Sequence, residues 1–154
     1  MVRVVICGIG NKLYGDEGIG PESLIELKKE VKRKDVLFLD CGRSPQDKTK
    51  KVLDYKPAKV IIISALDMKK GTGMVEELEP KTAKRFLMDD GQVDVGMFVG
   101  YLSNALEGKV LFVGYQPWSR EKGHTLSLEA RNALIIIKEL VLESLRFIKT
   151  ISKR

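Results

Sequence analysis

The run KVIIISALD at residues 59–67 constrains the fold most, because nearly every side chain in it is apolar. A strand that is hydrophobic on both faces is typical of a parallel sheet covered by helices on each side. Other apolar runs predict further strands at residues 2–7, 36–40, 71–78 and 109–117. The 71–78 segment starts with a Gly-Thr-Gly turn, and we expect it at the edge of the sheet.

Helices are expected between these strands. Pro21 suits the first turn of a helix over residues 21–33, where apolar residues follow at helical spacing. Further helices are predicted at residues 46–55, 80–88, 95–106 and 127–149. For the last one we expect Ser127 as the N-cap and an apolar side made of Leu128, Leu134, Ile135, Leu142, Leu145 and Ile148. The alternation predicts an α/β fold, a three-layer αβα sandwich with a mostly parallel, twisted sheet of about five strands.

Composition and length predict a single domain over residues 1–154, with 44% hydrophobic and 31% charged residues. No apolar run approaches the roughly 18 residues of a membrane span, and no secretory leader precedes the first strand, so we expect a cytoplasmic protein without membrane insertion. The net charge is +6, but basic residues are mixed with acidic ones along the chain, which argues against a nucleic-acid partner. Cys7 and Cys41 form no CxxC pair; buried free thiols are expected, with a bridge between strand ends as the alternative.

The functional site is expected where the parallel strands end, because α/β sheets bind ligands beyond the carboxyl ends of their strands. The segments that fall there are GIGNKLYGDEGIGP (8–21), DCGRSP (40–45), SALDMKKGTG (64–73) and GYQPWSREKGH (114–124).

The glycine-rich first segment suggests a phosphate loop, but its carboxylates argue against one. The dinucleotide pattern G-x-G-x-x-G needs a glycine where Leu13 stands, and no Gly-Lys-Ser/Thr follows. Asp16 and Glu17 precede the first helix, where a phosphate would need the positive end of the helix. We expect one acid to cap the helix and the other to point over the strand ends toward a ligand. A nucleotide-binding α/β protein stays a distant alternative, with Asp40 suited to a ribose hydroxyl.

These residues also carry a resemblance to a known family. GIGNKLYGDEGIGP meets every fixed position of the opening motif G-(I/V)-G-N-x-L-x-x-D-(D/E)-G-x-G-(P/V) of the hydrogenase maturation endopeptidases. These proteases trim the C-terminus of the large subunit of nickel–iron hydrogenases. The resemblance extends over nearly the whole chain through the segments LDCGRSPQ, KVIIISALDMKKGTG and VLFVGYQP.

The resemblance implies an endopeptidase that removes a C-terminal peptide from a nickel-loaded hydrogenase large-subunit precursor. It also implies no cofactor of the protease's own, because the family uses the nickel carried by the substrate for recognition. Of three side chains that contact this nickel, the second acid of the opening motif is present as Glu17. The other two, an Asp directly after the third strand and a His just before a helix, fall at Ser64 and at about Val95.

Carboxylates near these two positions are Asp67 and Asp94, and the sole histidine, His124, lies in a loop after the last strand. A neutral serine is a poor nickel ligand, and carboxylates suit harder cations. Three interpretations stay open. The chain is an active protease with a carboxylate cluster of Glu17, Asp67 and Asp94, a homologue that binds the precursor without cleaving it, or a relative whose substrate carries another cue or no nickel.

For an active protease we expect metal-assisted endoproteolysis, in which a metal polarises the scissile carbonyl or activates a water molecule. Glu17 is then a metal ligand or the general base, and Asp16 lies behind it or at the helix cap. The family-like segments place Asn11, Asp40, Gly42 and Gln116 in substrate binding. No Ser-His-Asp or Cys-His arrangement is evident in the sequence.

Overall fold

The computed structural model describes residues 2–152, in which five strands pair into one sheet of order β2-β1-β3-β5-β4. The strands are β1 (Val4–Ile9), β2 (Val36–Gly42), β3 (Lys59–Ala65), β4 (Val75–Leu78) and β5 (Val110–Tyr115). All neighbouring pairs are parallel except β4 with β5, so β4 is an antiparallel edge strand. The predicted mostly parallel sheet and the edge position of its fourth strand are confirmed.

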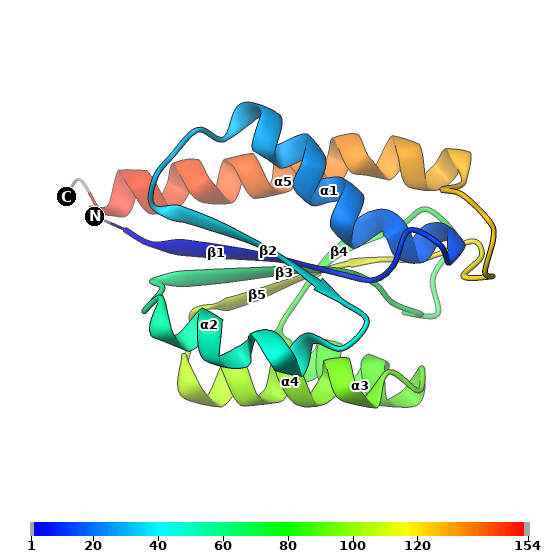
Figure 1. Cartoon of the computed structure of the whole chain (residues 1–154), viewed down its shortest axis with the longest axis horizontal. Helices are drawn as coiled ribbons and strands as arrows, with labels where there is room; N and C mark the ends of the chain where they lie inside the picture. The colour runs from blue at the N-terminus through cyan, green and yellow to red at the C-terminus, as the bar shows by residue number, and fades with distance from the viewer. Residues whose placement is uncertain (1, 153–154) are drawn as a thin grey trace.

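Helices cover both faces of this sheet. Two short 3₁₀ helices, η1 (Gly15–Gly18) and η2 (Pro45–Lys48), accompany α1 (Ile19–Glu30), α2 (Thr49–Asp54), α3 (Pro80–Asp89), α4 (Val93–Ala105) and α5 (Leu128–Ser152). Helices α1 and α5 lie on one face, and α2, α3 and α4 lie on the other (Figure 1). The three-layer αβα sandwich is therefore confirmed.

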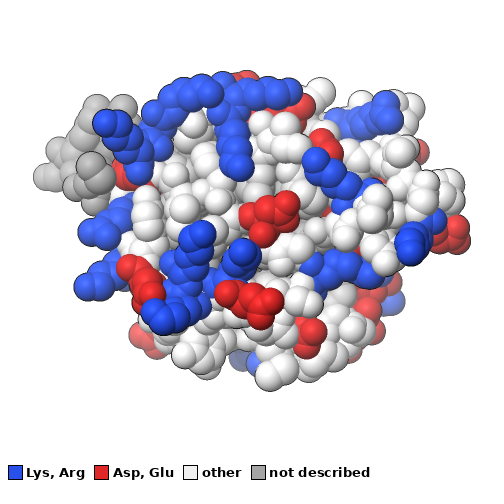
Figure 2. All heavy atoms as spheres, viewed as in Figure 1, with Lys and Arg blue, Asp and Glu red and all other residues white. Residues whose placement is uncertain are grey.

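The surface carries mixed charge. On the face drawn in Figure 2, Lys and Arg side chains are interspersed with Asp and Glu. Within residues 2–152, no helix combines the length and the apolarity needed to cross a lipid bilayer.

Strand β1 explains why the central runs are apolar throughout. Val5 and Cys7 pack in the cluster under α2, α3 and α4, whereas Val4 and Ile6 pack in the cluster under α1 and α5. Cys7 and Cys41 are both buried and free, which confirms the first of the two cysteine alternatives. A hydrogen-bond interaction with Cys41, together with burial, raises the pKa of Cys7 well above its ordinary value.

Helix α5 begins as predicted, and four of the six residues assigned to its apolar side pack in the core: Leu145 is buried, and Leu134, Leu142 and Ile148 are partly buried. The Ser127 hydroxyl accepts a hydrogen bond from the Ala130 amide at 3.1 Å, as expected of an N-cap. Leu128 and Ile135 are 71% and 62% exposed, so their assignment to the buried side is wrong. The fully buried side consists of Ala130, Ala133, Ile137, Val141 and Leu145. Apolar residues occur around most of this helix, and the small alanines decide which side approaches the sheet.

Two glycines of the opening motif bring β1 and α1 into backbone contact. A Cβ atom on Gly20 would lie 2.2 Å from the Ile9 carbonyl oxygen, and one on Gly8 would lie 2.6 Å from the Gly20 carbonyl oxygen. A side chain larger than hydrogen at either position therefore requires α1 to move away from β1. This contact fixes the residues between the strand and the helix at the carboxyl edge of the sheet.

We predict that Gly20→Ala destabilises the fold by at least about 2 kcal/mol, because the added methyl group overlaps backbone atoms that cannot rotate away. Urea unfolding measures the change in the free energy of unfolding. Gly71→Ala is the control, since a Cβ there meets no atom within 4 Å, and it should change stability by less than about 0.5 kcal/mol. Equal stability of the two variants would contradict the close contact.

Candidate active site

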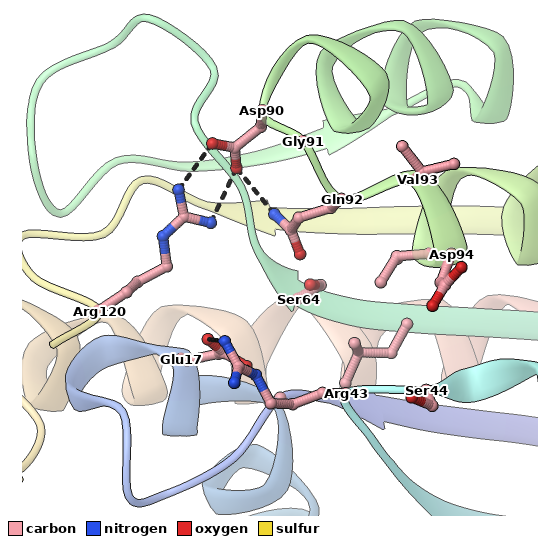
Figure 3. A pocket seen from close by; sticks show the side chains of 13 residues that line it. Glu17, Arg43, Ser44, Ser64, Asp90, Gly91, Gln92, Val93, Asp94 and Arg120 are labelled. Atoms are coloured by element: carbon pink, nitrogen blue, oxygen red, sulfur yellow. Dashed lines mark hydrogen bonds and ion pairs between the residues drawn. The ribbon is translucent and has the colours of Figure 1, made fainter. Parts of the chain in front are cut away.

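A pocket with a volume of about 680 Å³ opens beyond the carboxyl ends of β1 and β3. The strand order reverses between these two strands, which is where α/β sheets bind ligands. The pocket is lined by Ile9, Gly10, Glu17, Arg43, Ser44, Ser64, Asp90, Gly91, Gln92, Val93, Asp94, Val95 and Arg120 (Figure 3). Each of the four segments that we expected at this edge contributes to the lining, and the turn between α3 and α4 adds a fifth.

Glu17 projects from η1 into this pocket, with 13% of its side chain exposed. Both carboxylate oxygens are occupied by Arg43, whose Nε lies 2.7 Å from Oε1 and whose Nη2 lies 3.3 Å from Oε2. The Arg43 guanidinium also stacks 3.9 Å from the centre of the Tyr14 ring. Gly42 has a φ of +58°, so it supplies the left-handed turn that directs the chain from β2 to Arg43.

Asp90 is a second carboxylate of the pocket, on the turn after α3, and its side chain is 9% exposed. It accepts hydrogen bonds from Arg120 Nη1 and Nη2 at 2.8 and 2.7 Å and from Gln92 Nε2 at 2.8 Å. Burial acts to raise the pKa of Asp90, but the bonds from Arg120 and Gln92 hold it below its ordinary value. Hydrogen bonding to Asp90 raises the pKa of Arg120, so this is a charged, bidentate pair.

Asp16 is 1% exposed and turns away from the pocket. Its carboxylate accepts hydrogen bonds from the Tyr115 hydroxyl at 3.0 Å, from the Trp118 amide at 2.9 Å, and from both the amide and the hydroxyl of Ser127 at 2.8 Å. No side-chain cap bond is present at α1, so the expectation that one acid of the motif caps this helix is wrong. Asp16 instead joins the opening motif to the segment between β5 and α5.

Asp67 and Gln116 form a separate network beside the pocket. Asp67 accepts hydrogen bonds from Gln116 Nε2 at 3.1 Å and from the amide and the ammonium group of Lys69 at 3.0 Å. These bonds, those from Lys69 first, lower the pKa of Asp67 to about 2. Gln116 Oε1 accepts the Met68 amide at 2.7 Å. Both side chains therefore brace the loop after β3, and neither belongs to the pocket lining in the described chain.

Asn11 and Asp40 also bond locally. Asn11 Oδ1 accepts the Leu13 amide at 2.8 Å, and Asp40 Oδ1 accepts the Gly42 amide at 3.2 Å. Neither residue lines the pocket, nor does Gly42. Of the side chains predicted for catalysis, metal contact or substrate binding, the pocket brings together Glu17 and Asp94.

The resemblance assigned two further metal-contact positions, to Ser64 and to about Val95. Ser64 is buried at the pocket and donates a hydrogen bond to the Ala65 carbonyl oxygen at 3.0 Å. Val95 lies inside α4, which starts at Val93, and its side chain packs in the core. The residues directly before α4 are Asp90 to Gln92, and the assignment of the family's histidine position to about Val95 stays a prediction.

His124 is exposed and contacts its own loop, with Nδ1 3.0 Å from the Ser119 hydroxyl and Nε2 3.4 Å from Glu121. In the part of the chain that the structure describes, no three His, Cys, Asp or Glu side chains lie close enough to hold a metal ion. The structure thus does not bring Glu17, Asp67 and Asp94 together as one cluster.

Sequence reasoning missed Arg43, Arg120 and Asp90. The two arginines lie in segments that were expected at the site, so their position in the sequence could have identified them as pocket residues. Asp90 precedes a glycine before a predicted helix, but nothing in the sequence pairs it with an arginine thirty residues later.

Comparisons with known proteins agree with this fold. A family model described as hydrogenase maturation protease matches residues 21–144. Hydrogenase 3 maturation protease of Escherichia coli is 27% identical over 118 residues, which cover 76% of this chain and 74% of the relative. The crystal structure of the NiFe hydrogenase maturation protease HycI from Thermococcus kodakarensis is 27% identical, with a TM-score of 0.81 over 94% of this chain and 93% of the other. The endopeptidase HybD of Escherichia coli, at 23% identity and a TM-score of 0.80, shares the fold.

The fold and the edge pocket define an α/β protein whose site is built around a carboxylate of the first glycine-rich turn. The chain belongs to the hydrogenase maturation protease family.

We predict that Asp16→Ala lowers the free energy of unfolding by roughly 3 kcal/mol or more, because it leaves the buried Tyr115 hydroxyl and the partly buried amides of Trp118 and Ser127 without their acceptor. Thermal or urea unfolding measures this loss. Asp94→Ala removes an exposed carboxylate and should change stability by less than about 0.5 kcal/mol. A fully stable Asp16→Ala protein would exclude the structural role of this carboxylate.

Proposed function

We propose that this chain is an endopeptidase that removes a C-terminal peptide from a hydrogenase large-subunit precursor. The observation that carries the proposal is Glu17, the acid of the family motif, which projects into the pocket at the carboxyl edge of the sheet. Membership of the hydrogenase maturation protease family supports it. In this proposal any nickel belongs to the precursor, the protease has no metal of its own, and the reaction takes place in the cytoplasm.

The chemistry proposed for the pocket is attack of water on a peptide carbonyl. Glu17 is the general base that takes a proton from the water molecule, a role that needs a carboxylate within hydrogen-bond reach of the substrate. As the C–N bond breaks, Glu17 returns this proton to the leaving nitrogen, and the C-terminal peptide is released with a free amino group. Arg43 and Arg120 place positive charge at the same pocket, where it stabilises the oxyanion that develops on the carbonyl oxygen. Asp94, at the start of α4, is proposed to contact the peptide on the other side.

Asn11, Asp40, Gly42 and Gln116 act indirectly in this proposal. Gly42 directs Arg43 toward Glu17, and Gln116 supports the loop after β3 through the Met68 amide. Their role is to hold the segments that border the bound peptide.

Binding without cleavage is the second candidate function. It is favoured by Arg43, which occupies both oxygens of Glu17 and leaves the carboxylate without an unpaired oxygen for a water molecule. Incubation with the precursor separates the two candidates.

We predict that the purified protein shortens its cognate large-subunit precursor, and that Glu17→Gln slows cleavage at least about 100-fold, because the amide is not a base. Mass spectrometry of the precursor measures the loss of a C-terminal peptide. Glu22→Gln, a change of a glutamate that pairs with Lys12 outside the pocket, should cleave at nearly the wild-type rate. An intact precursor in a stable complex with the wild-type protein would exclude the protease and support binding alone.

The exposed side of α4 is the surface on which we expect the precursor to dock. Val93, Met97 and Tyr101 are spaced four residues apart, which places them on one side of the helix, and they are 44%, 59% and 58% exposed. Val93 also lines the pocket, so this apolar side is continuous with the proposed cleavage site. Exposed apolar side chains that gather on one surface are typical of protein interaction sites.

We predict that Met97→Glu raises the KM for the precursor at least about tenfold with little change in kcat, because a charge replaces an apolar contact of the docking surface. Steady-state cleavage assays measure both constants. Ile135→Glu is the control, since Ile135 is equally exposed but lies on α5, on the opposite face of the sheet. Equal KM values for the two variants would contradict docking on α4.

A further inference from the structure

We propose that the pocket recognises a metal-free stretch of polypeptide, and that Arg43 and Arg120 take the place that a metal ion would have at its carboxylates. This inference rests on the proposed function, because it names the form of the precursor that the pocket accepts. It follows from what surrounds each potential ligand atom in the pocket (Figure 3).

The carboxylate of Glu17 is already neutralised by the chain's own cation. Arg43 binds both of its oxygens, at 2.7 and 3.3 Å, and the guanidinium is held in place on the Tyr14 ring. A guanidinium stays protonated at any physiological pH, and its planar fork matches a carboxylate with two bonds. A divalent cation at Glu17 must therefore displace a fixed positive charge.

Asp90 is neutralised in the same way and is more deeply buried. Besides the two bonds from Arg120 and the bond from Gln92, its Oδ2 accepts the Asp67 amide at 3.2 Å. Oδ2 accepts three of these bonds and Oδ1 accepts one, from Arg120 Nη2, so both oxygens of the carboxylate are already bonded. A metal ion at Asp90 must therefore displace Arg120 or lie directly beside its guanidinium charge.

The remaining polar side chains do not supply the metal ligands that Glu17 and Asp90 fail to offer. Ser64 offers a neutral hydroxyl that already bonds to the Ala65 carbonyl, whereas nickel favours imidazole, and His124 is engaged with Ser119 and Glu121 outside the pocket. Three lining carboxylates face two guanidinium groups, so the described lining keeps a single negative charge, which Asp94 carries. This balance suits peptide groups and one basic side chain better than a divalent ion.

Binding of nickel ion alone tests the inference without any substrate. We expect wild-type protein and Glu17→Gln to give the same calorimetric titration with nickel chloride at neutral pH, since the wild-type pocket contributes no site. One nickel bound by the wild type with a dissociation constant below about 10 μM, and lost in Glu17→Gln, would overturn the inference.

Nickel-free and nickel-loaded precursors then test recognition directly. We expect the wild type to bind and cleave both forms with constants that agree within about threefold. Tenfold tighter binding or faster cleavage of the loaded form would overturn the inference. Absence of cleavage of either form, with equal binding of both, rejects the protease but supports metal-free recognition. If neither form binds, the proposed function is wrong. The nickel titration then supports or overturns the inference by itself, because it needs no precursor.

A matched pair of arginine variants assigns the effect to the pocket. Arg43→Ala uncovers the Glu17 carboxylate, so we expect this variant to favour the nickel-loaded precursor at least about threefold. Arg33→Ala breaks a similar bidentate pair with Asp35, which directly precedes β2 at the amino ends of the strands. This variant should bind the nickel-free and nickel-loaded precursors equally well. An Arg43→Ala protein that binds and cleaves the two precursor forms equally would show that Arg43 does not exclude the metal.

Discussion

The buried carboxylate of Asp16 is the interaction on which the site depends. It lies in the turn after β1 but receives its hydrogen bonds from the end of β5, from the loop that follows and from the start of α5. A buried carboxylate is tolerated when several donors surround it, and here those donors come from segments about a hundred residues away. The same loop carries Arg120, and the residue next to Asp16 is Glu17. One carboxylate therefore sets the distance between the two sides of the pocket.

This anchoring explains how two neighbouring acids have opposite surroundings. In the 3₁₀ helix η1, consecutive side chains point in different directions, so Asp16 enters the interior while Glu17 faces the pocket. Both carboxylates remain satisfied, Asp16 by neutral donors and Glu17 by a guanidinium. The glycines around them allow the tight turn, because a Cβ atom on Gly10 would overlap the Glu17 carbonyl. The motif thus places one acidic side chain in the protein interior and the other at the carboxyl ends of the strands.

The sequence was sufficient for the layers of the fold and for the edge that carries the pocket, because both follow from the period and length of apolar runs. The sequence did not predict which side chains form hydrogen bonds or ion pairs with each acidic residue. Pairs such as Asp90 with Arg120 join loops whose spacing is set by tertiary structure, and no local pattern reports them. The helix predicted over residues 95–106 starts at Val93 in the structure, because helix starts are less sharply encoded than helix interiors. Asp67 lay close in sequence to the expected acid, yet its contacts belong to the loop after β3.

If recognition is metal-free, as proposed, the ion pairs of the pocket determine what it can select. A metal-binding site discriminates by ligand geometry and is empty until the ion arrives, whereas guanidinium–carboxylate pairs are complete before any substrate binds. Arg43 is half-exposed and Arg120 is more enclosed, so the Glu17 side of the pocket is the easier one to open. A peptide that enters there meets preformed charges instead of an ion to be coordinated. Selection of the precursor must then come from peptide sequence and from the surface next to the pocket, where the exposed apolar side of α4 begins.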